Sequence, residues 1–134
     1  ALQLANKNNI EISYSLGDLS NLNYSQNQFD VIALIYAHFN ADSKSEIHHS
    51  LTYLLKPEGT IILEAFSKTH IHYQKENPGV GGPRDIDILF SIEEIKSDFN
   101  DFDIQLLIEK EIHLNEGKFH NGVGSVIRFI GTKK

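Results

Sequence analysis

The sequence of 134 residues predicts an α/β fold in which a mainly parallel sheet ends in an antiparallel hairpin. Short apolar runs typical of strands alternate with amphipathic helical segments, which is the pattern of crossover connections between parallel strands. The last two strand-like runs, residues 104–112 and 122–132, are joined by residues 113–121. This connection is too short for a crossover helix, so these two strands should pair antiparallel.

The composition is that of one soluble globular domain, with 40% hydrophobic and 22% charged residues. No apolar run approaches the roughly 18 residues of a membrane span, so we expect no membrane segment. The net charge of −6 disfavours nucleic acid as a partner. The chain has no cysteine, which excludes a disulfide framework and a thiolate zinc site. Residues 1–5 lack the pattern of a signal peptide, and we expect a cytoplasmic protein.

The first half of the chain reads as helix, strand, strand, helix, strand. An opening helix ends at residues 6–9, and residues 10–14 alternate apolar and polar positions as a strand does. Residues 29–35 are almost continuously apolar, which predicts a central strand covered on both faces. A capping box at residues 43–46 opens a helix that Lys-Pro-Glu-Gly ends, and residues 60–66 form a buried strand. The apolar face of that helix consists of Ile47, Leu51, Leu54 and Leu55.

The second half begins with a long stretch, residues 67–90, that we expect to be irregular. Stretches of this length in a compact domain are usually lids or binding loops. A second capping box at residues 91–94 opens a short helix, and the hairpin follows. That helix should turn Ile92, Ile95 and Phe99 inward. Five strands are expected in all, with residues 122–132 inserted beside residues 60–65 and residues 29–35 on their other side.

Several local sequences resemble those of class I S-adenosylmethionine-dependent methyltransferases. Gly17-Asp18-Leu19 resembles the acidic motif beside the adenine, and residues 29–32 resemble the strand that follows it. Residues 54–63, with Lys-Pro-Glu-Gly inside, closely resemble the next helix, turn and strand. Residues 81–83 and 116–120 look like a bacterial tellurite-resistance-type branch of the family. The resemblance implies a Rossmann-like sheet and S-adenosylmethionine as cofactor.

The glycine-rich cofactor loop of that family is missing from this chain. Its one glycine cluster, residues 79–84, follows no strand and opens no helix, which is the wrong context for a dinucleotide-type loop. The missing part would lie before Ala1, so we expect residues 1–134 to be the carboxy-terminal two-thirds of a single methyltransferase domain. The isolated chain is then expected to be inactive and to bind the cofactor no more tightly than the millimolar range.

The cofactor should lie at the carboxyl ends of the strands, as ligands do in open α/β sheets. The resemblance implies that Asp18 accepts a hydrogen bond from the adenine amino group and that Leu19 packs on the adenine ring. The alternative for Asp18 is a turn residue whose side chain bonds its own backbone. Tyr36 and Ala37, after the second strand, would contact the methionine part of the cofactor, or Tyr36 is a plain strand-end aromatic. His38 is a candidate general base, with a polar surface histidine as the alternative.

Other polar residues are candidates for the acceptor side. Glu64 is a carboxylate in a buried strand and needs a partner or water, so it is a candidate catalytic residue in the acceptor site. Tyr73, Arg84 and His120 are candidates for binding an anionic or soft substrate. The histidines do not predict a metal site: His48 and His49 point apart on a helix, and the third ligand needed beside His70 and His72 would have to be Glu76.

Two functions follow from these observations. The first is methyl transfer to a small-molecule acceptor such as a thiol, a tellurite-like oxyanion or an amine. The alternative is a non-catalytic α/β interaction module that has lost cofactor binding. In addition, a strand at residues 29–35 without its missing neighbours would expose an apolar sheet edge, and we expect self-association through that edge.

Overall fold

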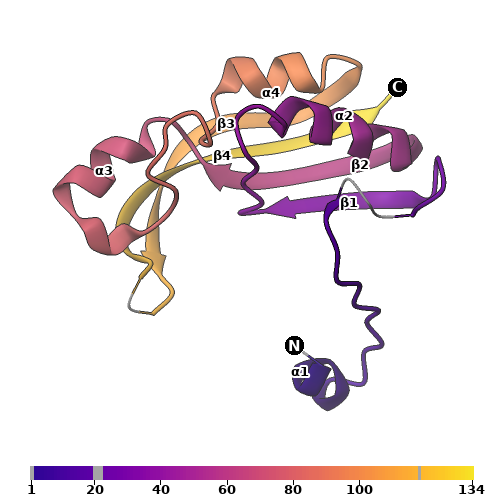
Figure 1. Ribbon diagram of the computed structural model, residues 1–134, viewed down its shortest axis with the longest axis horizontal. Coiled ribbons are helices and arrows are strands. Elements are labelled where there is room, and N and C mark those ends of the chain that lie inside the picture. Colours follow the sequence, from indigo (N-terminus) through magenta and orange to yellow (C-terminus); the bar gives the residue numbers. More distant parts are fainter. Residues whose placement is uncertain (1, 20–22, 118) are drawn as a thin grey trace.

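The computed structural model describes residues 2–19, 23–117 and 119–134 and has a four-stranded sheet with helices around it (Figure 1). The strands are β1 (Phe29–Ile35), β2 (Leu55–Phe66), β3 (Phe102–Asn115) and β4 (Asn121–Lys133). The helices are α1 (Leu2–Lys7), α2 (Lys44–Leu54), α3 (His70–Glu76) and α4 (Ile92–Asp98), with a 3-10 turn η2 (Pro78–Val80). No helix in the described ranges is long and apolar enough to cross a membrane.

The sheet has the order β1-β2-β4-β3 and confirms the predicted fold class. β1 and β2 are parallel, with Ala33 opposite Ile62. β4 lies antiparallel between β2 and β3, with Ile62 opposite Ile130. β3 and β4 therefore pair antiparallel, as their short connection required, and β4 lies in the interior of the sheet.

α2 and α4 cover one face of the sheet and bury the main core against it (Figure 1). Alternate residues of β2 point to this face and are almost completely buried, as the pleat of a strand requires. Phe99, at the end of α4, stacks on Phe129 of β4 with 5.0 Å between the ring centroids. The β2 residues on this face are Ile61, Leu63 and Ala65.

The opposite face is covered at one end only. There α3 and η2 pack against Phe66 and Val126 in a second, smaller cluster. Across the middle, an apolar row runs through all four strands, in which Ala33, Ile62, Ile130 and Leu106 are consecutive cross-strand partners. Large apolar side chains remain 38–56% exposed on or beside this row: Val31, Ile35, Ile62 and Ile108.

Two strand predictions are corrected. β1 is an edge strand with one covered face, although its almost continuous apolar run predicted a central strand covered on both. Residues 10–14 form no strand, because no described strand lies beside them to complete a hydrogen-bonded ladder. Figure 1 shows this segment running away from the sheet to α1. Its apolar residues are therefore exposed: Ile10, Ile12 and Tyr14. The structure consequently has four strands, not five.

The two expected capping boxes have different outcomes. Ser91 forms one: its hydroxyl accepts from the Glu94 backbone N–H, and the Glu94 carboxylate accepts from the Ser91 N–H. Ser43 does not cap α2, because its backbone is already helical and its hydroxyl donates instead to the Asn40 carbonyl. A cap needs an extended backbone to turn its side chain onto the first free N–H groups, so the sequence pattern alone is insufficient.

Residues 67–90 are more ordered than expected, because α3 and η2 lie inside them. Lys44, at the start of α2, binds the end of this segment through hydrogen bonds. Its buried ammonium donates to the carbonyls of Asp87 and Leu89 and to the carboxylate of Glu94. The segment is therefore anchored at its carboxyl end against α2 and α4.

Candidate functional site

A hydrogen-bonded triad joins Tyr36, the residue that follows β1, to Glu64 of β2 and Arg128 of β4. The Tyr36 hydroxyl donates to Glu64 Oε1 at 2.9 Å, and Arg128 Nε donates to Glu64 Oε2 at 2.6 Å. The pairing of β2 with β4 sets Glu64 directly opposite Arg128. Burial, followed by the hydrogen bond to Glu64, raises the pKa of Tyr36 far above its ordinary value. Tyr36 is therefore a protonated phenol at neutral pH.

His38 links the ends of β1 and β2 with both of its ring nitrogens. Nε2 accepts from the Phe66 backbone N–H at 3.2 Å, so Nδ1 is the protonated nitrogen and donates to the Tyr36 carbonyl at 3.1 Å. Burial lowers the pKa of His38, which keeps this neutral tautomer at neutral pH. Because the lone pair on Nε2 is engaged by the backbone, this geometry favours a positioning role for His38. Its assignment as a base stays a prediction.

Phe66, the last residue of β2, lies at the centre of a layer of rings. Its ring contacts those of Tyr36 and His38 on one side, with centroids at 4.9 and 5.7 Å. His70 stacks on Phe66 at 4.0 Å, and His120 stacks at 6.3 Å. The chain thus brings together two predicted site residues that follow β1 and one from the β3–β4 connection. We call Tyr36, His38, Phe66, His70 and His120 the ring layer.

A cavity of about 780 Å³ runs along β1 beneath α2, which is within the usual range of ligand pockets. It joins Asp18 and Leu19, the predicted adenine residues, to His38 beyond the carboxyl end of β1. Its wall is otherwise mainly apolar and includes Phe29, Ile32 and Leu51. We call it the β1 cavity. The lining thus combines the carboxylate of Asp18 with mainly apolar side chains.

A second cavity of about 560 Å³ lies by α3 and includes Arg84. Gly81 and Gly82 form part of its wall, with φ angles of 69° and 84° that favour glycine. We call it the α3 cavity. A Cβ on Gly82 would stand 2.9 Å from the Phe66 ring, so the glycine turn packs directly on the ring layer.

The remaining predicted site residues lie around these features. Ala37 is partly buried against the main core. The Tyr73 hydroxyl donates to Glu111 of β3, which, with some desolvation, raises the pKa of Tyr73. His120 belongs to the ring layer, and its ring lies 2.7 Å from a Cβ built on Gly81. Of the predicted acceptor residues, Arg84 and His120 therefore both lie by the glycine turn, while Tyr73 packs against the second cluster and is engaged by β3.

The histidines considered as metal ligands have other partners. His70 is buried on α3, not on an extended segment as expected, because the segment that holds it is helical. Its Nδ1 accepts from the Ser125 N–H and its Nε2 donates to the Gly81 carbonyl. Burial lowers the pKa of His70. His48 bonds Asp98 through Nδ1 at 2.7 Å. Within the described ranges, no three His, Asp or Glu residues are grouped so as to hold a metal ion.

Sequence reasoning missed two residues of this region. Arg128 holds Glu64, and the signal was available: a lone arginine interrupts the apolar strand β4 as Glu64 interrupts β2. Phe66 was read only as part of a buried strand. Nothing in its local pattern distinguishes a ring that organises four neighbours from an ordinary core residue.

Comparison with known proteins finds one matching family model, over the first part of the chain. Residues 1–63 match the family model described as a methyltransferase domain. A comparison with curated proteins found no match.

Solved structures show the same fold over most of the chain. An S-adenosylmethionine-dependent methyltransferase from Methanosarcina mazei superposes with a TM-score of 0.63 and 16% identity, over 89% of this chain and 66% of that one. TehB from Haemophilus influenzae superposes with a TM-score of 0.69 and 17% identity, over 99% of this chain and 45% of that one. A methyltransferase from Aquifex aeolicus superposes with a TM-score of 0.60 and 15% identity, over 99% of this chain and 61% of that one.

The chain thus spans about half to two-thirds of the length of these solved proteins. Together with the β1-β2-β4-β3 sheet, the superpositions establish a Rossmann-like methyltransferase fold, and the match of residues 1–63 is to the methyltransferase domain.

Proposed function

We propose that the chain takes part in methyl transfer from S-adenosylmethionine to a small-molecule acceptor. The observation that carries the proposal is the β1 cavity, which joins Asp18 and Leu19 to the carboxyl end of β1 in a methyltransferase fold. Open α/β sheets bind ligands at this end of their strands. The acidic balance of the chain favours a small molecule over nucleic acid as the acceptor.

The residues of the β1 cavity fit the adenine end of the cofactor. Asp18 would accept a hydrogen bond from the adenine amino group, and Leu19 would pack on the ring. Tyr36 and Ala37, just past β1, do not line this cavity, and in the proposal they would lie beyond it toward the methionine part. S-adenosylmethionine, when bound, supplies a methyl group on a sulfonium, which is ready for displacement by a lone pair held in line.

The protonation states favour an acceptor that needs no general base. Tyr36 keeps its proton, both oxygens of Glu64 accept hydrogen bonds, and the lone pair of His38 is held by the backbone. A thiolate or an oxyanion carries its own lone pair and requires only positioning. These two acceptors therefore suit the site better than one that must first lose a proton to a base. Glu64 then acts as a positioning residue for Tyr36.

The test is an NMR titration of the ¹⁵N-labelled chain with S-adenosylmethionine. We expect shifts of amides that line the β1 cavity, with a dissociation constant in the millimolar range, corresponding to about 4 kcal/mol. Asp18→Ala should weaken binding by about 1–3 kcal/mol, the value of a lost hydrogen-bond partner. Asp103→Ala is the matched control, because Asp103 lies exposed on β3 and pairs only loosely with Lys134. Equal effects of the two substitutions, or shifts confined to other surfaces, would contradict the proposal.

A further inference from the structure

The α3 cavity is cationic in a chain that is acidic overall. Its two charged lining residues are Lys75 and Arg84, and no acidic side chain among the described residues lines it. The whole chain carries eighteen acidic and twelve basic residues. A cavity that excludes acidic side chains from such a surface concentrates positive potential, and low-dielectric walls strengthen its attraction for an anion.

One wall of this cavity holds a buried acceptor without a partner. Gln74 Nε2 donates to the carbonyls of Gly81 and Pro83, at 2.6 and 3.0 Å. These two bonds define the orientation of the amide, since a flipped amide would set its oxygen against two carbonyls. Gln74 Oε1 is buried and accepts no hydrogen bond within the described ranges. A buried acceptor of this kind costs free energy until a donor reaches it.

The other side chains that line the cavity are apolar: Ile71, Pro78 and Phe119. Phe119 is 76% exposed, which leaves a large ring surface for a ligand to cover. These lining residues together suit one class of ligand. Its anionic group would meet the two cations, its N–H or O–H donor would meet Gln74, and its apolar body would meet Phe119. The volume of about 560 Å³ accommodates a molecule larger than an inorganic ion.

The α3 cavity and the β1 cavity both border the ring layer. His38 lines the β1 cavity and stacks on Phe66. Gly82 lines the α3 cavity, and a Cβ there would stand 2.9 Å from the Phe66 ring. A ligand in the α3 cavity is therefore next to the residues that border the proposed cofactor site.

We propose that the α3 cavity binds a small organic anion with an apolar body and an N–H or O–H donor, and, resting on the proposed function, that this is the acceptor class. Arg84 and Lys75 bind the anionic group, Gln74 Oε1 accepts from the donor, and Phe119 packs on the apolar body. The glycine turn holds these groups against the ring layer, because any larger residue at positions 81 and 82 would displace Phe66 or His120.

The experiment is an NMR titration of the full chain without cofactor, with three probes: 3-hydroxybenzoate, benzoate and 3-hydroxybenzyl alcohol. 3-Hydroxybenzoate carries all three recognised features, benzoate lacks the donor and the alcohol lacks the charge. We expect 3-hydroxybenzoate to shift the amides of Gly81 and Gly82 and to bind several-fold more tightly than benzoate. The alcohol should bind weakest. Equal affinities for all three probes would overturn the proposal.

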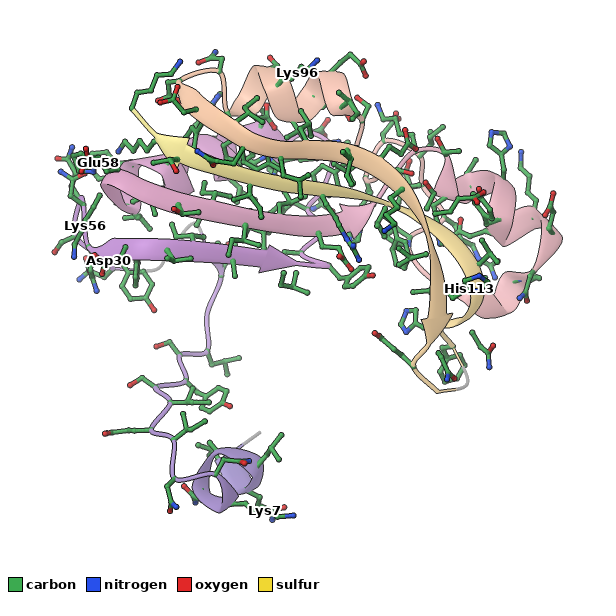
Figure 2. The ribbon with its side chains drawn as sticks, turned by 180° about the vertical axis from the view of Figure 1, so that it is seen from behind. Lys7, Asp30, Lys56, Glu58, Lys96 and His113 are labelled. Carbon is green, nitrogen blue, oxygen red and sulfur yellow. The ribbon has the colours of Figure 1, made fainter. Side chains whose placement is uncertain are left out.

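Charge-neutral variants test the cations. The double variant Lys75→Gln with Arg84→Gln should weaken the binding of 3-hydroxybenzoate by about fivefold or more, since each exposed ion pair contributes up to about 1 kcal/mol. Lys96→Gln is the matched control; Figure 2 shows Lys96 on the outer surface of α4. An unchanged affinity in the double variant would show that the anion does not bind these cations and would overturn the proposal.

The same samples separate this inference from the proposed function. Adding S-adenosylmethionine should shift the β1 cavity amides in an Asp18-dependent manner, whether or not the probe is present. Cofactor shifts without probe shifts at Gly81 and Gly82 would overturn the anion site and leave the proposed function standing. Probe shifts without cofactor shifts would leave an anion site and contradict the acceptor assignment.

Discussion

One face of the sheet is buried under α2 and α4, while the middle of the other face is exposed. On the covered face, Ile61 and Leu63 are almost fully buried; on the other, their neighbour Ile62 is 38% exposed. These residues are equally apolar and consecutive in one strand. An apolar composition makes burial of a sheet face favourable, but the face becomes buried only where the chain places helices over it. Substitutions on the two faces should therefore have very different effects.

The largest effect is expected on the covered face. Phe99→Ala would remove a fully buried ring that packs on Phe102 and Phe129. Large-to-small changes of this kind cost about 3–5 kcal/mol, because a cavity remains. Urea unfolding followed by circular dichroism measures the loss. A cost comparable with that of an exposed residue would mean that α4 does not hold the core.

The next effect concerns the polar contact between the two covering helices. Asp98 of α4 accepts from Ser45 Oγ and His48 Nδ1 of α2, at 2.6 and 2.7 Å. Asp98→Ala would leave two donors without a partner, at about 1–3 kcal/mol for each buried one. Asp98→Asn should cost less, because its amide oxygen still accepts one bond. Equal unfolding free energies for the wild type and the alanine variant would refute this role.

The third prediction concerns pH and the ring layer, which lies where the second face is covered. Burial lowers the pKa of both His38 and His70 below the ordinary 6.5. As pH falls through that value, these histidines bind protons in the unfolded chain before they do in the folded one. The free energy of unfolding is therefore highest above about pH 6.5 and decreases below it.

Replacing either buried histidine tests this dependence. His38→Gln or His70→Gln should reduce the pH slope of the urea midpoint between about pH 7.5 and pH 5.5. His49→Gln is the control, because His49 is exposed on α2. A slope that His49→Gln reduces as much as the other two would contradict the assignment to buried histidines.

The smallest effect on stability is expected in the exposed row. Ile62→Lys should change the unfolding free energy by about 0.5 kcal/mol or less, since the side chain is already partly in water. Its effect should appear in assembly. We propose that the apolar row and the free edge of β1 support self-association. Sedimentation velocity at low micromolar concentration should show association in the wild type and less in the variant.

Tyr53→Lys is the control for that experiment, because Tyr53 is 55% exposed on α2, away from the open face. If both substitutions weaken self-association equally, the association does not depend on the open face of the sheet in particular. A monomeric wild type would refute the proposal.

The sequence predicted those features that depend on local pattern and chain length. The parallel pair, the antiparallel hairpin and the Ser91 capping box follow from alternation, connection length and residue spacing. It failed where a partner decides the outcome. Residues 10–14 have the alternation of a strand but no described neighbour to bond. Ser43 has the residue type of a cap but not the backbone angle.

The candidate site shows the same division. Asp18, Leu19 and His38 were proposed from strand ends, and all three line one cavity. Only His38 follows a strand, at the carboxyl end of β1 where ligands bind in such sheets, because residues 10–14 form none. The ring layer could not be predicted, because it joins residues from the end of β1, β2, α3 and the hairpin connection. The ion pair of Lys56 with Asp30 is similar: the two lie 26 positions apart and meet because β1 and β2 begin side by side (Figure 2).

The buried ammonium of Lys44 has a consequence for how the protein folds. An ammonium removed from water without its partners is strongly unfavourable, and the partners of Lys44 come from two other segments, residues 87–89 and α4. Neither segment can hold Lys44 alone, so α2, the end of the α3 region and α4 should dock in one cooperative step. Native-state hydrogen exchange would then show the amides of α2 and α4 opening together, with one free energy and one dependence on denaturant.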